Sequence, residues 1–419
     1  MLARVRTAPR LFGEIRVPGD KSISHRALML NAIADGVARV SNLSPGADVA
    51  STATCLAQLG VTIEAGLVRG VGRSGLREPS GPLDCGNSGT TMRLLAGILA
   101  GQRFSSTLTG DNSLSRRPMG RVAEPLRLMG AQVSTEPLRV GGWAPLRAID
   151  YRTPVASAQV KSALLLAGLY AEGETTIREP GLSRDHTELM MRAMGANLQS
   201  SGLEVRLRPS GELAALDVEV PGDLSSAAFW LVLGSLHGNA ELSIPSVGIN
   251  PTRAGILDLM DGAGFEVERR RPRLAGEEPV ADLLVSSSRA AHRFDVTAAE
   301  SAALIDELPV LAVAASVLSG TTTVTGASEL AVKESDRITA MTTGLRAMGA
   351  DIEPAADGWV IRGPRRLEGA RVDSFGDHRV AMSLAIAAML AGGETEIDGA
   401  ECVEISYPGF WDQLESLCR

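Results

Sequence analysis

The stretch TTMRLLAGILAGQRFSSTLTG, residues 90–110, decides the fold. Its first part is rich in leucine and small residues, would be apolar on every side of a helix, and ends at Gly101, where a helix can stop. Its second part has the β-branched residues and the alternation of a strand. The stretch therefore predicts a buried helix followed directly by a strand.

This helix-then-strand pattern occurs six times, about every 65 to 80 residues. The six helical stretches are 22–36, 90–101, 160–173, 224–238, 307–320 and 377–393. A second helix ends before another strand at Gly60, Gly130, Gly195, Gly264 and Gly349, and the sixth copy ends in residues 410–418. We therefore predict an α/β fold of six strand–helix–strand–helix–strand units, with the alanine-rich helices buried and the amphipathic helices outside. Three units in each of two similar domains would leave a cleft between them.

The composition is that of a globular chain, with 419 residues of which 44% are apolar, and this length favours two or three domains. The four cysteines have no metal-ligand spacing, so we expect reduced thiols, no disulfide framework and no metal site. A net charge of −8 with 3% aromatic residues disfavours nucleic-acid binding. No apolar run is long enough for export or membrane insertion, and we expect a cytoplasmic protein.

Lysine is scarce in this chain. Of 41 basic residues only Lys21, Lys161 and Lys333 are lysines, and each lies in a polar motif. An ammonium group is a compact charge that can give up a proton, whereas a guanidinium group is a wide and permanently charged fork. We interpret the three lysines as positions where arginine will not serve, with codon bias as the alternative.

Polar residues cluster at the expected N-terminal ends of the buried helices. They are Asp20, Lys21 and Ser22; Asn87, Ser88, Gly89 and Thr90; Ser157 and Gln159; Asp223 and Ser225; and Asp377, His378 and Arg379. Helix N-termini attract anions through free N–H groups and the helix dipole, so several of them aimed at one cleft predict an anionic ligand. N-capping explains any one helix taken alone, but it does not require basic residues beside the caps. These basic residues are Lys21, Arg26, Arg93, Arg117, Lys333, Arg337 and Arg379.

Eight motifs, in order along the whole chain, resemble the 5-enolpyruvylshikimate-3-phosphate synthase family. They are PGDKSISHR (18–26), LDCGNSGTTMRLL (83–95), SRRPMGR (115–121), SAQVKSALLLAG (157–168), SRDHTE (183–188), DELPVLA (306–312), VKESDR (332–337) and GDHRVAM (376–382). The resemblance implies transfer of the enolpyruvyl group of phosphoenolpyruvate to the 5-hydroxyl of shikimate 3-phosphate, with release of phosphate, in the chorismate route to aromatic amino acids. We expect no cofactor, no metal, no nucleic-acid or membrane partner, and a monomer.

The family fold has two domains, each of three βαβαββ units in an inside-out α/β barrel, with the active site in the interdomain cleft. This agrees with the six-fold repeat. We expect residues 1–19 and 222–419 to form a discontinuous domain 1, and residues 20–221 to form an inserted domain 2. The crossings would lie where the sequence VPGD occurs, at 17–20 and 220–223.

The resemblance also implies residue roles. Lys21 would touch both substrates, and shikimate 3-phosphate would be held by Ser22, Arg26, Ser157, Ala158, Gln159 and Arg184. Phosphoenolpyruvate would be held by Gly89, Arg117, Arg337 and Arg379, because forked guanidinium groups suit carboxylate and phosphate oxygens. Asp306 would take the proton of the 5-hydroxyl, and Glu334 would protonate C3. Either Lys21 or Lys333 would carry the proton of the leaving phosphate, and Asp306 and Lys333 would also contact substrate.

Two positions depart from the family pattern: Ile405 stands where a lysine is common, and Glu329 where part of the family has an asparagine. Gly89 matches the pattern that is sensitive to glyphosate, an inhibitor that occupies the phosphoenolpyruvate subsite. Two alternatives remain. One is the related UDP-N-acetylglucosamine enolpyruvyl transferase, whose reactive cysteine would fall near Asn112 and Ser113. The other is a non-catalytic or RNA-end-processing relative of the same repeat fold.

Overall fold

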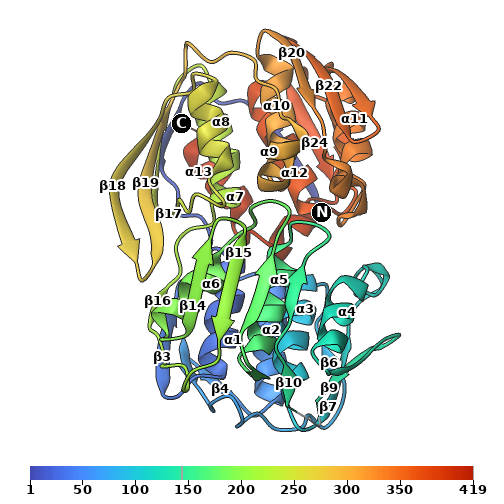
Figure 1. The fold of residues 1–419 in the computed structure, drawn as a ribbon. Helices are drawn as coiled ribbons and strands as arrows, with labels where there is room; N and C mark the ends of the chain where they lie inside the picture. The colour runs from blue at the N-terminus through green and yellow to red at the C-terminus, as the bar shows by residue number, and fades with distance from the viewer. Residues whose placement is uncertain (143–144, 419) are drawn as a thin grey trace. The chain divides into compact units, whose positions relative to one another are not determined.

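The computed structural model describes residues 1–142 and 145–418, which form two compact units (Figure 1). Unit 1 consists of Met1–Pro18, Pro221–Arg273 and Pro279–Arg419, and unit 2 consists of Gly19–Val220 and Leu274–Glu278. Each unit has a hydrophobic core of its own. The fold is mixed α/β, as the sequence predicts.

Unit 2 is built from short strands that alternate with helices. Its strands are β3 (Val37–Ser41), β4 (Thr62–Glu64), β5 (Leu67–Arg69), β6 (Leu83–Asp84), β7 (Ser105–Thr109), β8 (Gln132–Thr135), β9 (Leu138–Gly141), β10 (Leu146–Arg147), β11 (Asp150–Arg152), β12 (Ala171–Glu172), β13 (Thr175–Arg178), β14 (Asn197–Ser201), β15 (Glu204–Arg208) and β16 (Val218–Glu219). Its helices are α1 (Lys21–Ala32), α2 (Ala47–Gln58), α3 (Gly89–Ala100), η1 (Leu114–Arg116), α4 (Gly120–Leu128), α5 (Ala158–Gly168) and α6 (His186–Ala193).

The three four-stranded sheets of unit 2 share one plan. In the sheet β6-β7-β9-β8, β6 runs parallel to β7, and the hairpin of β8 and β9 adds two antiparallel strands. The sheet β11-β13-β15-β14 repeats this order. In the sheet β16-β3-β5-β4, the parallel place beside β3 is taken by β16, from the end of the unit. Each sheet thus holds one copy of the helix-then-strand repeat.

Unit 1 contains the first two strands of the chain and everything after unit 2 except the turn Leu274–Glu278 between β18 and β19. Its strands are β1 (Leu2–Arg6), β2 (Leu11–Glu14), β17 (Ala240–Gly248), β18 (Val267–Ala275), β19 (Glu278–Ser286), β20 (Gly320–Val324), β21 (Asp351–Ala355), β22 (Gly358–Gly363), β23 (Arg371–Asp373) and β24 (Glu394–Asp398). Its helices are α7 (Leu224–Leu236), α8 (Gly255–Gly262), α9 (Ala298–Leu304), α10 (Leu308–Val317), η2 (Ser328–Val332), α11 (Arg337–Ala347), α12 (His378–Leu390), η3 (Ala400–Ile405) and α13 (Phe410–Leu417).

The sheets of unit 1 vary the same plan. In the sheet β18-β19-β17-β2, β2 is parallel to β17, and β17 is antiparallel to β19. The sheet β20-β22-β21 is antiparallel throughout. In the sheet β1-β24-β23, β23 is parallel to β24, and the antiparallel edge is β1 from the start of the chain, with Ala3 opposite Ile397. The sixth copy therefore continues into η3 and α13 instead of a hairpin.

The alanine-rich helices α1, α3, α5, α7, α10 and α12 are buried, which confirms the sequence prediction. Every residue of α7 from Leu224 to Ser235 is buried. In unit 2, α3 and α5 lie side by side (Figure 1). A Cβ at Gly97 of α3 would lie 2.2 Å from the Ala163 carbonyl oxygen of α5, so only glycine permits this approach.

The outer helices are amphipathic and end at glycine, as predicted. For example, α4 buries Val122 and Leu126 while Arg121 and Arg127 are exposed. The five glycines after the outer helices have φ between 74° and 99°, the left-handed conformation of a helix C′ residue. These are Gly60, Gly130, Gly195, Gly264 and Gly349.

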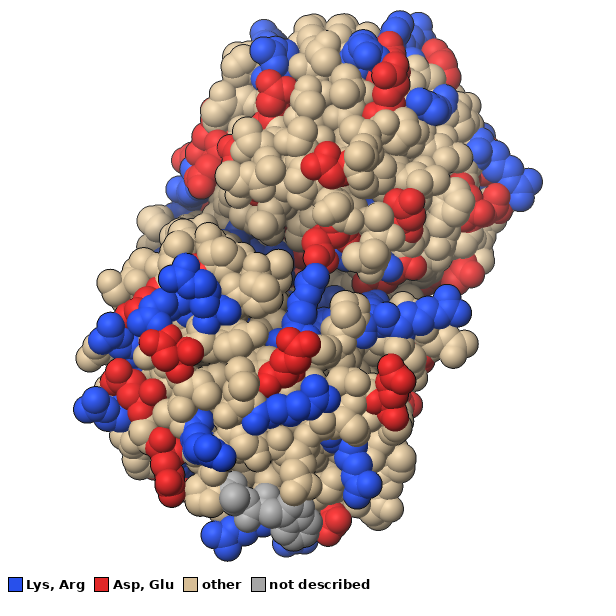
Figure 2. Space-filling view, turned by 45° about the vertical axis from the view of Figure 1, so that its right-hand side comes forward, with Lys and Arg blue, Asp and Glu red and all other residues tan. Residues whose placement is uncertain are grey.

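The surface carries basic and acidic side chains interspersed over the face seen in Figure 2. Among the residues described, no helix has the length and apolarity to cross a membrane. Within the same residues, no group of three or more His, Cys, Asp or Glu side chains could hold a metal ion. The cysteines are free thiols: Cys55, Cys85 and Cys402 are buried, and Cys418 is exposed.

Candidate active site

The first expected binding motif lies at the N-terminus of α1 in unit 2. Asp20 caps the helix by accepting a hydrogen bond from the Ile23 N–H at 2.9 Å. Lys21 is the first helical residue, and its Nζ lies 2.9 Å from Asp48 Oδ2 near the start of α2. The Lys21 side chain remains 32% exposed, so a ligand can reach the ammonium group.

Arg26 lies one turn further along α1 and is buried. Its Nε donates to Thr187 Oγ1 at 2.6 Å, one Nη donates to Ser162 Oγ at 2.8 Å, and the other donates to the Ser22 carbonyl at 2.9 Å. Burial lowers the pKa of Arg26 to about 10, which still leaves it charged at neutral pH. Arg184 Nη1 lies 3.4 Å from Ser22 Oγ, so Ser22, Arg26 and Arg184 lie close together.

A buried hydrogen-bond chain joins the N-terminal parts of α1, α2 and α3. His25 Nδ1 and Thr91 Oγ1 each lie 2.7 Å from Thr52 Oγ1, and Thr91 Oγ1 lies 2.7 Å from Ser88 Oγ and 3.3 Å from the Asp48 carbonyl. Burial lowers the pKa of His25 to about 3, so the imidazole is neutral at physiological pH. The chain therefore fixes the helix that begins at Gly89 against the one that begins at Lys21.

The start of α3 brings Gly89 together with two arginines and α5. A Cβ at Gly89 would lie 2.9 Å from Arg93 Nη1 and 3.4 Å from Arg117 Nη1. Arg117 donates to Asn87 Oδ1 at 2.9 Å. Arg93 donates to Gln159 Oε1, and Gln159 Nε2 donates to Thr90 Oγ1 at 2.9 Å. The expected residues Gly89, Arg117 and Gln159 therefore form one surface.

Ser157 and Ala158 mark the start of α5. Ser157 caps the helix by accepting from the Val160 N–H at 3.4 Å, and its own N–H donates to Glu179 Oε1 at 3.1 Å. Ala158 is the first helical residue. Its side chain adds no polar group, so the feature of Ala158 that would suit an anion is its position among the free N–H groups of a helix N-terminus.

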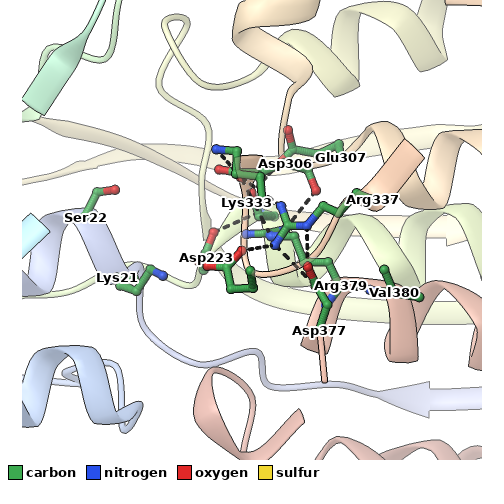
Figure 3. Close-up of polar contacts among 12 residues, drawn as sticks. Lys21, Ser22, Asp223, Asp306, Glu307, Lys333, Arg337, Asp377, Arg379 and Val380 are labelled. Carbon is green, nitrogen blue, oxygen red and sulfur yellow. Dashed lines mark hydrogen bonds and ion pairs between the residues drawn. The ribbon is translucent and has the colours of Figure 1, made fainter. Parts of the chain in front are cut away.

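In unit 1, four cationic side chains surround the carboxylate of Asp306. The Oδ1 atom lies 3.9 Å from Lys333 Nζ, 3.8 Å from Arg337 Nη1 and 3.8 Å from Arg379 Nε, and Oδ2 lies 3.7 Å from Arg253 Nη1. Figure 3 shows Lys333, Arg337 and Arg379 converging on Asp306. Arg379 also donates to the Asp306 carbonyl at 2.9 Å. The cluster thus combines one carboxylate with four cationic groups.

Arg337 also joins Glu334 to Asp377. This guanidinium is 1% exposed, and it donates to Glu334 Oε2 at 2.6 Å and to Asp377 Oδ2 at 2.8 Å. Burial alone would raise the pKa of Asp377, but Arg337 outweighs burial and holds this pKa below its ordinary value. Asp377 in turn caps α12 by accepting from the Arg379 N–H at 2.8 Å. The second expected proton carrier, Glu334, is therefore anchored beside two expected phosphoenolpyruvate ligands.

Sequence reasoning missed Arg253 and Glu307 as parts of this cluster. Arg253 is buried, and its Nη2 donates to Asp223 Oδ1 at 2.9 Å and to Ser225 Oγ at 2.6 Å. Its Nη1 lies 3.9 Å from Glu307 Oε1, and Ser225 Oγ donates to the same oxygen. Burial raises the pKa of Glu307 although Arg253 lowers it. The only sequence signal was the DEL motif for Glu307. Arg253 lies in the turn between β17 and α8, two residues before α8 begins, and belongs to none of the motifs.

The expected site residues fall into two sets. Unit 2 holds Lys21, Ser22, Arg26, Gly89, Arg117, Ser157, Ala158, Gln159 and Arg184, and unit 1 holds Asp306, Lys333, Glu334, Arg337 and Arg379. Within each unit, the contacts above bring the set together. Ile405, at the departure from the family pattern, ends η3 and is 44% exposed.

Known proteins are similar to this chain over nearly its whole length. Residues 5–414 match the sequence model of the family described as EPSP synthase (3-phosphoshikimate 1-carboxyvinyltransferase). The 3-phosphoshikimate 1-carboxyvinyltransferase of Synechococcus sp. (strain RCC307) is 52% identical over 427 residues, which cover 98% of this chain and 97% of that protein. The one from Syntrophomonas wolfei is 50% identical over 419 residues, which cover 97% of each.

Solved structures give the same result. The 2.37 Å structure of EPSP synthase from Acinetobacter baumannii superposes with a TM-score of 0.90 at 41% identity, covering 100% of this chain and 98% of that chain. A second EPSP synthase structure from the same organism has the same TM-score at 40% identity. With matches of this extent in sequence and in structure, the chain belongs to the EPSP synthase (3-phosphoshikimate 1-carboxyvinyltransferase) family.

Proposed function

We propose that this chain transfers the enolpyruvyl group of phosphoenolpyruvate to the 5-hydroxyl of shikimate 3-phosphate and releases phosphate. Membership of the EPSP synthase family supports the reaction. The observation that carries the proposal at the level of residues is the carboxylate of Asp306, which has four cations within 4 Å. A base among anion-binding groups is what proton removal beside a bound phosphoenolpyruvate requires.

Shikimate 3-phosphate is bound by unit 2 in this proposal. Arg26 and Arg184 supply guanidinium groups beside Ser22, and the start of α5 supplies Ser157, Ala158 and Gln159. Guanidinium groups and free helix N–H groups both favour a phosphate dianion. Lys21, partly exposed beside them, contacts both substrates.

Phosphoenolpyruvate is bound by residues of both units. Arg117 and Gly89 come from unit 2, and Lys333, Arg337 and Arg379 come from unit 1. Cationic groups suit its carboxylate and its phosphate. At the start of α3, a side chain at position 89 would crowd Arg93 and Arg117, so glycine leaves space beside both guanidinium groups.

The chemistry is an addition followed by an elimination. Asp306 accepts the proton of the 5-hydroxyl as its oxygen attacks C2, and Glu334 gives a proton to C3. Elimination then removes a proton from C3 and breaks the bond between C2 and the phosphate oxygen. The leaving phosphate is stabilised and protonated by Lys21 or Lys333, and the two lysines remain alternatives for this step. No cofactor takes part.

We further propose the domain organisation that the sequence predicts, with a discontinuous domain 1 of residues 1–19 and 222–419 and an inserted domain 2 of residues 20–221. The boundaries of the compact units after Pro18 and Val220 support it, with the exception of the turn Leu274–Glu278. The three sheets of one plan in unit 2 support three βαβαββ units in that domain.

The test is release of phosphate from phosphoenolpyruvate, with shikimate 3-phosphate or UDP-N-acetylglucosamine as acceptor. Release only with shikimate 3-phosphate is expected, and release only with the UDP-sugar would favour the related transferase. Release with neither acceptor would favour a non-catalytic relative. Asp306→Asn should bind shikimate 3-phosphate with near-normal affinity in calorimetric titration but lose about 10²-fold in turnover, the usual scale for an acid–base group. Normal turnover in this variant would contradict the role of Asp306.

A further inference from the structure

Lys161 is the one lysine that the proposed mechanism leaves without a role, and it lies in the interior of unit 2. Its side chain is 4% exposed, near the start of α5. Its Nζ lies 2.7 Å from Glu179 Oε2 and 2.8 Å from Glu188 Oε1, and it donates to the Ser183 carbonyl at 3.4 Å. An ammonium group has three donors, so these three acceptors use all of them.

The three acceptors belong to one segment, residues 179–188, which consists of the link between β13 and α6 and the first three residues of α6. Glu179 and Glu188 lie at the two ends of the segment and Ser183 lies inside it, so one ammonium group holds it at three points. Arg184, the expected ligand of shikimate 3-phosphate, directly follows Ser183. The position of its backbone therefore depends on the contacts of Lys161.

Glu179 connects Lys161 to the start of α5. While its Oε2 faces Lys161, its Oε1 accepts the hydrogen bond of the Ser157 N–H at 3.1 Å. Ser157 is the capping residue of α5 and an expected substrate contact. The carboxylate thus fixes the end of the helix to the same ammonium group that holds the Arg184 segment.

The next residue, Ser162, makes the corresponding link to Arg26. Ser162 Oγ lies 2.7 Å from Thr187 Oγ1 and accepts from Arg26 at 2.8 Å, while Arg26 Nε donates to Thr187 Oγ1 at 2.6 Å. Two pairs of neighbouring residues therefore join α5 to α6: Lys161 contacts Glu188, and Ser162 contacts Thr187. Ser162 and Thr187 also accept the hydrogen bonds of Arg26. Three expected ligands of shikimate 3-phosphate are thus joined to this network: Ser157 and Arg26 by hydrogen bonds, and Arg184 through its neighbour Ser183.

The charge of the network explains why a lysine is present. Burial alone would lower the pKa of Lys161, but the carboxylates of Glu188 and Glu179 outweigh it and raise this pKa above its ordinary value, so the group stays charged. A tetrahedral ammonium group can donate in three diverging directions, whereas the donors of a guanidinium group lie in one plane. An arginine could not contact Glu179, Ser183 and Glu188 from this position in the same way.

We propose that Lys161 is a positioning residue for shikimate 3-phosphate. It sets the relative positions of the α5 N-terminus and of Arg184 before the substrate arrives. The inference rests on the proposed function, because it assumes that these groups bind shikimate 3-phosphate. It predicts a loss of affinity for that substrate with little change in the later steps.

Calorimetric titration with shikimate 3-phosphate, together with steady-state kinetics, tests the proposal. Lys161→Met keeps a long unbranched side chain without the charge. We expect its dissociation constant for shikimate 3-phosphate to rise about tenfold or more, the scale of a lost hydrogen bond between charged groups. At saturating shikimate 3-phosphate, kcat and the KM for phosphoenolpyruvate should stay within about threefold of the wild type, because neither depends on a contact of Lys161.

A second variant covers the case in which Lys161→Met does not fold. Glu179→Gln keeps the size of the side chain, but its amide can satisfy only Ser157 or Lys161 with an oxygen, not both. Its dissociation constant for shikimate 3-phosphate should rise about threefold to tenfold, as one hydrogen bond is lost. Val205→Ala is the matched control: Val205 is buried in β15 of the same unit, and the change should lower the melting temperature without changing this dissociation constant.

Each outcome has a defined meaning. Wild-type affinity for shikimate 3-phosphate in either folded variant overturns the proposal, as does a fall in kcat with no change in this affinity. An equal loss of affinity in Val205→Ala would assign the effect to stability and would also overturn it. A wild-type protein that neither binds nor converts shikimate 3-phosphate would instead remove the proposed function itself.

Discussion

A methyl group at Gly89 tests whether the start of α3 binds phosphoenolpyruvate. A Cβ there would lie 2.9 Å from Arg93 Nη1 and 3.4 Å from Arg117 Nη1, and ordinary contact begins at 3.4 Å. Arg93 must therefore retreat by about 0.5 Å (3.4 − 2.9), while Arg117 can stay in place. The clash is with the end of a flexible side chain, so the fold should tolerate Gly89→Ala.

The size of the effect follows from the contacts of Arg93. Arg93 donates to Gln159, and a hydrogen bond to a charged group contributes about 1.5 to 3 kcal/mol. A partial loss, on the order of 1 kcal/mol, would raise the KM for phosphoenolpyruvate about fivefold. Glyphosate is a longer molecule than phosphoenolpyruvate and meets the new methyl group as well. Overpacking costs about 1 to 3 kcal/mol, so its inhibition constant should rise about 5-fold to 150-fold.

Steady-state phosphate release measures both constants, with glyphosate varied against phosphoenolpyruvate at saturating shikimate 3-phosphate. We expect the wild type to be inhibited competitively, and Gly89→Ala to raise the inhibition constant more than the KM. Gly262→Ala in α8 is the matched control, because a Cβ at Gly262 meets no atom within 4 Å. If the wild type ignores millimolar glyphosate, or if Gly89→Ala leaves the inhibition constant unchanged, this helix end is not the phosphoenolpyruvate subsite.

Three further changes probe separate parts of the molecule. Lys21→Arg should lose about 10²-fold in turnover, because the longer, planar guanidinium group does not place a compact charge where the ammonium group lies and does not give up a proton. If the variant keeps most of the activity, the scarcity of lysine is accidental. Arg253→Met removes the cation that pairs with the buried carboxylates of Asp223 and Glu307, so we expect kcat to fall at least tenfold and the melting temperature to drop. An unchanged kcat would show that Arg253 does not act on the Asp306 cluster. His25 has an ordinary pKa of 6.5 that burial lowers to about 3, so its contribution to stability is complete above pH 6.5 and is lost as the pH falls from 6.5 toward 3. At pH 5 this loss of stability is about 2 kcal/mol (1.5 pH units at 1.36 kcal/mol each). Urea unfolding at pH 7.5 and at pH 5 measures the loss, and we expect it to be absent in His25→Gln. An equal loss in the variant would exclude His25 as the source of the pH dependence.

The helical part of the fold could be predicted from sequence because its signals are local. A small-residue helix that ends at glycine is visible within about 15 residues, and the structure has such helices where the repeat places them. Strands as short as β6 or β16 have no periodicity to detect. The pairing of β1 with β24 could not be predicted either, since Arg4 and Glu396 are separated by 392 residues of chain. The cytoplasmic location and the monomeric state stay predictions.

The candidate site shows a similar limit. Residues within motifs, such as Arg26 and Asp306, could be named from sequence because a resemblance to one family covers the whole chain. Arg253 could not be named, because its importance comes from burial beside Asp306 and Glu307 and not from a motif. Lys161 is intermediate: its rarity marked it, but only its contacts with Glu179 and Glu188 indicate what it does.

The charges around Asp306 bear on the proposal that phosphoenolpyruvate is bound by residues of unit 1 and of unit 2. Arg253, Lys333, Arg337 and Arg379 contribute four positive charges, and Asp223, Asp306, Glu307, Glu334 and Asp377 contribute five negative charges, so the formal sum is −1. Burial raises the pKa of Glu307, and its protonation would bring the sum only to zero. An anion must then compete with carboxylates already present. In unit 2, Arg26 donates to the uncharged oxygens of Thr187, Ser162 and Ser22, so no carboxylate takes its hydrogen bonds, although, against the effect of burial, Glu188 and Asp20 act on its charge and raise its pKa. The charge count around Asp306 therefore supports the proposal that cations of unit 2, in addition to those of unit 1, take part in binding phosphoenolpyruvate.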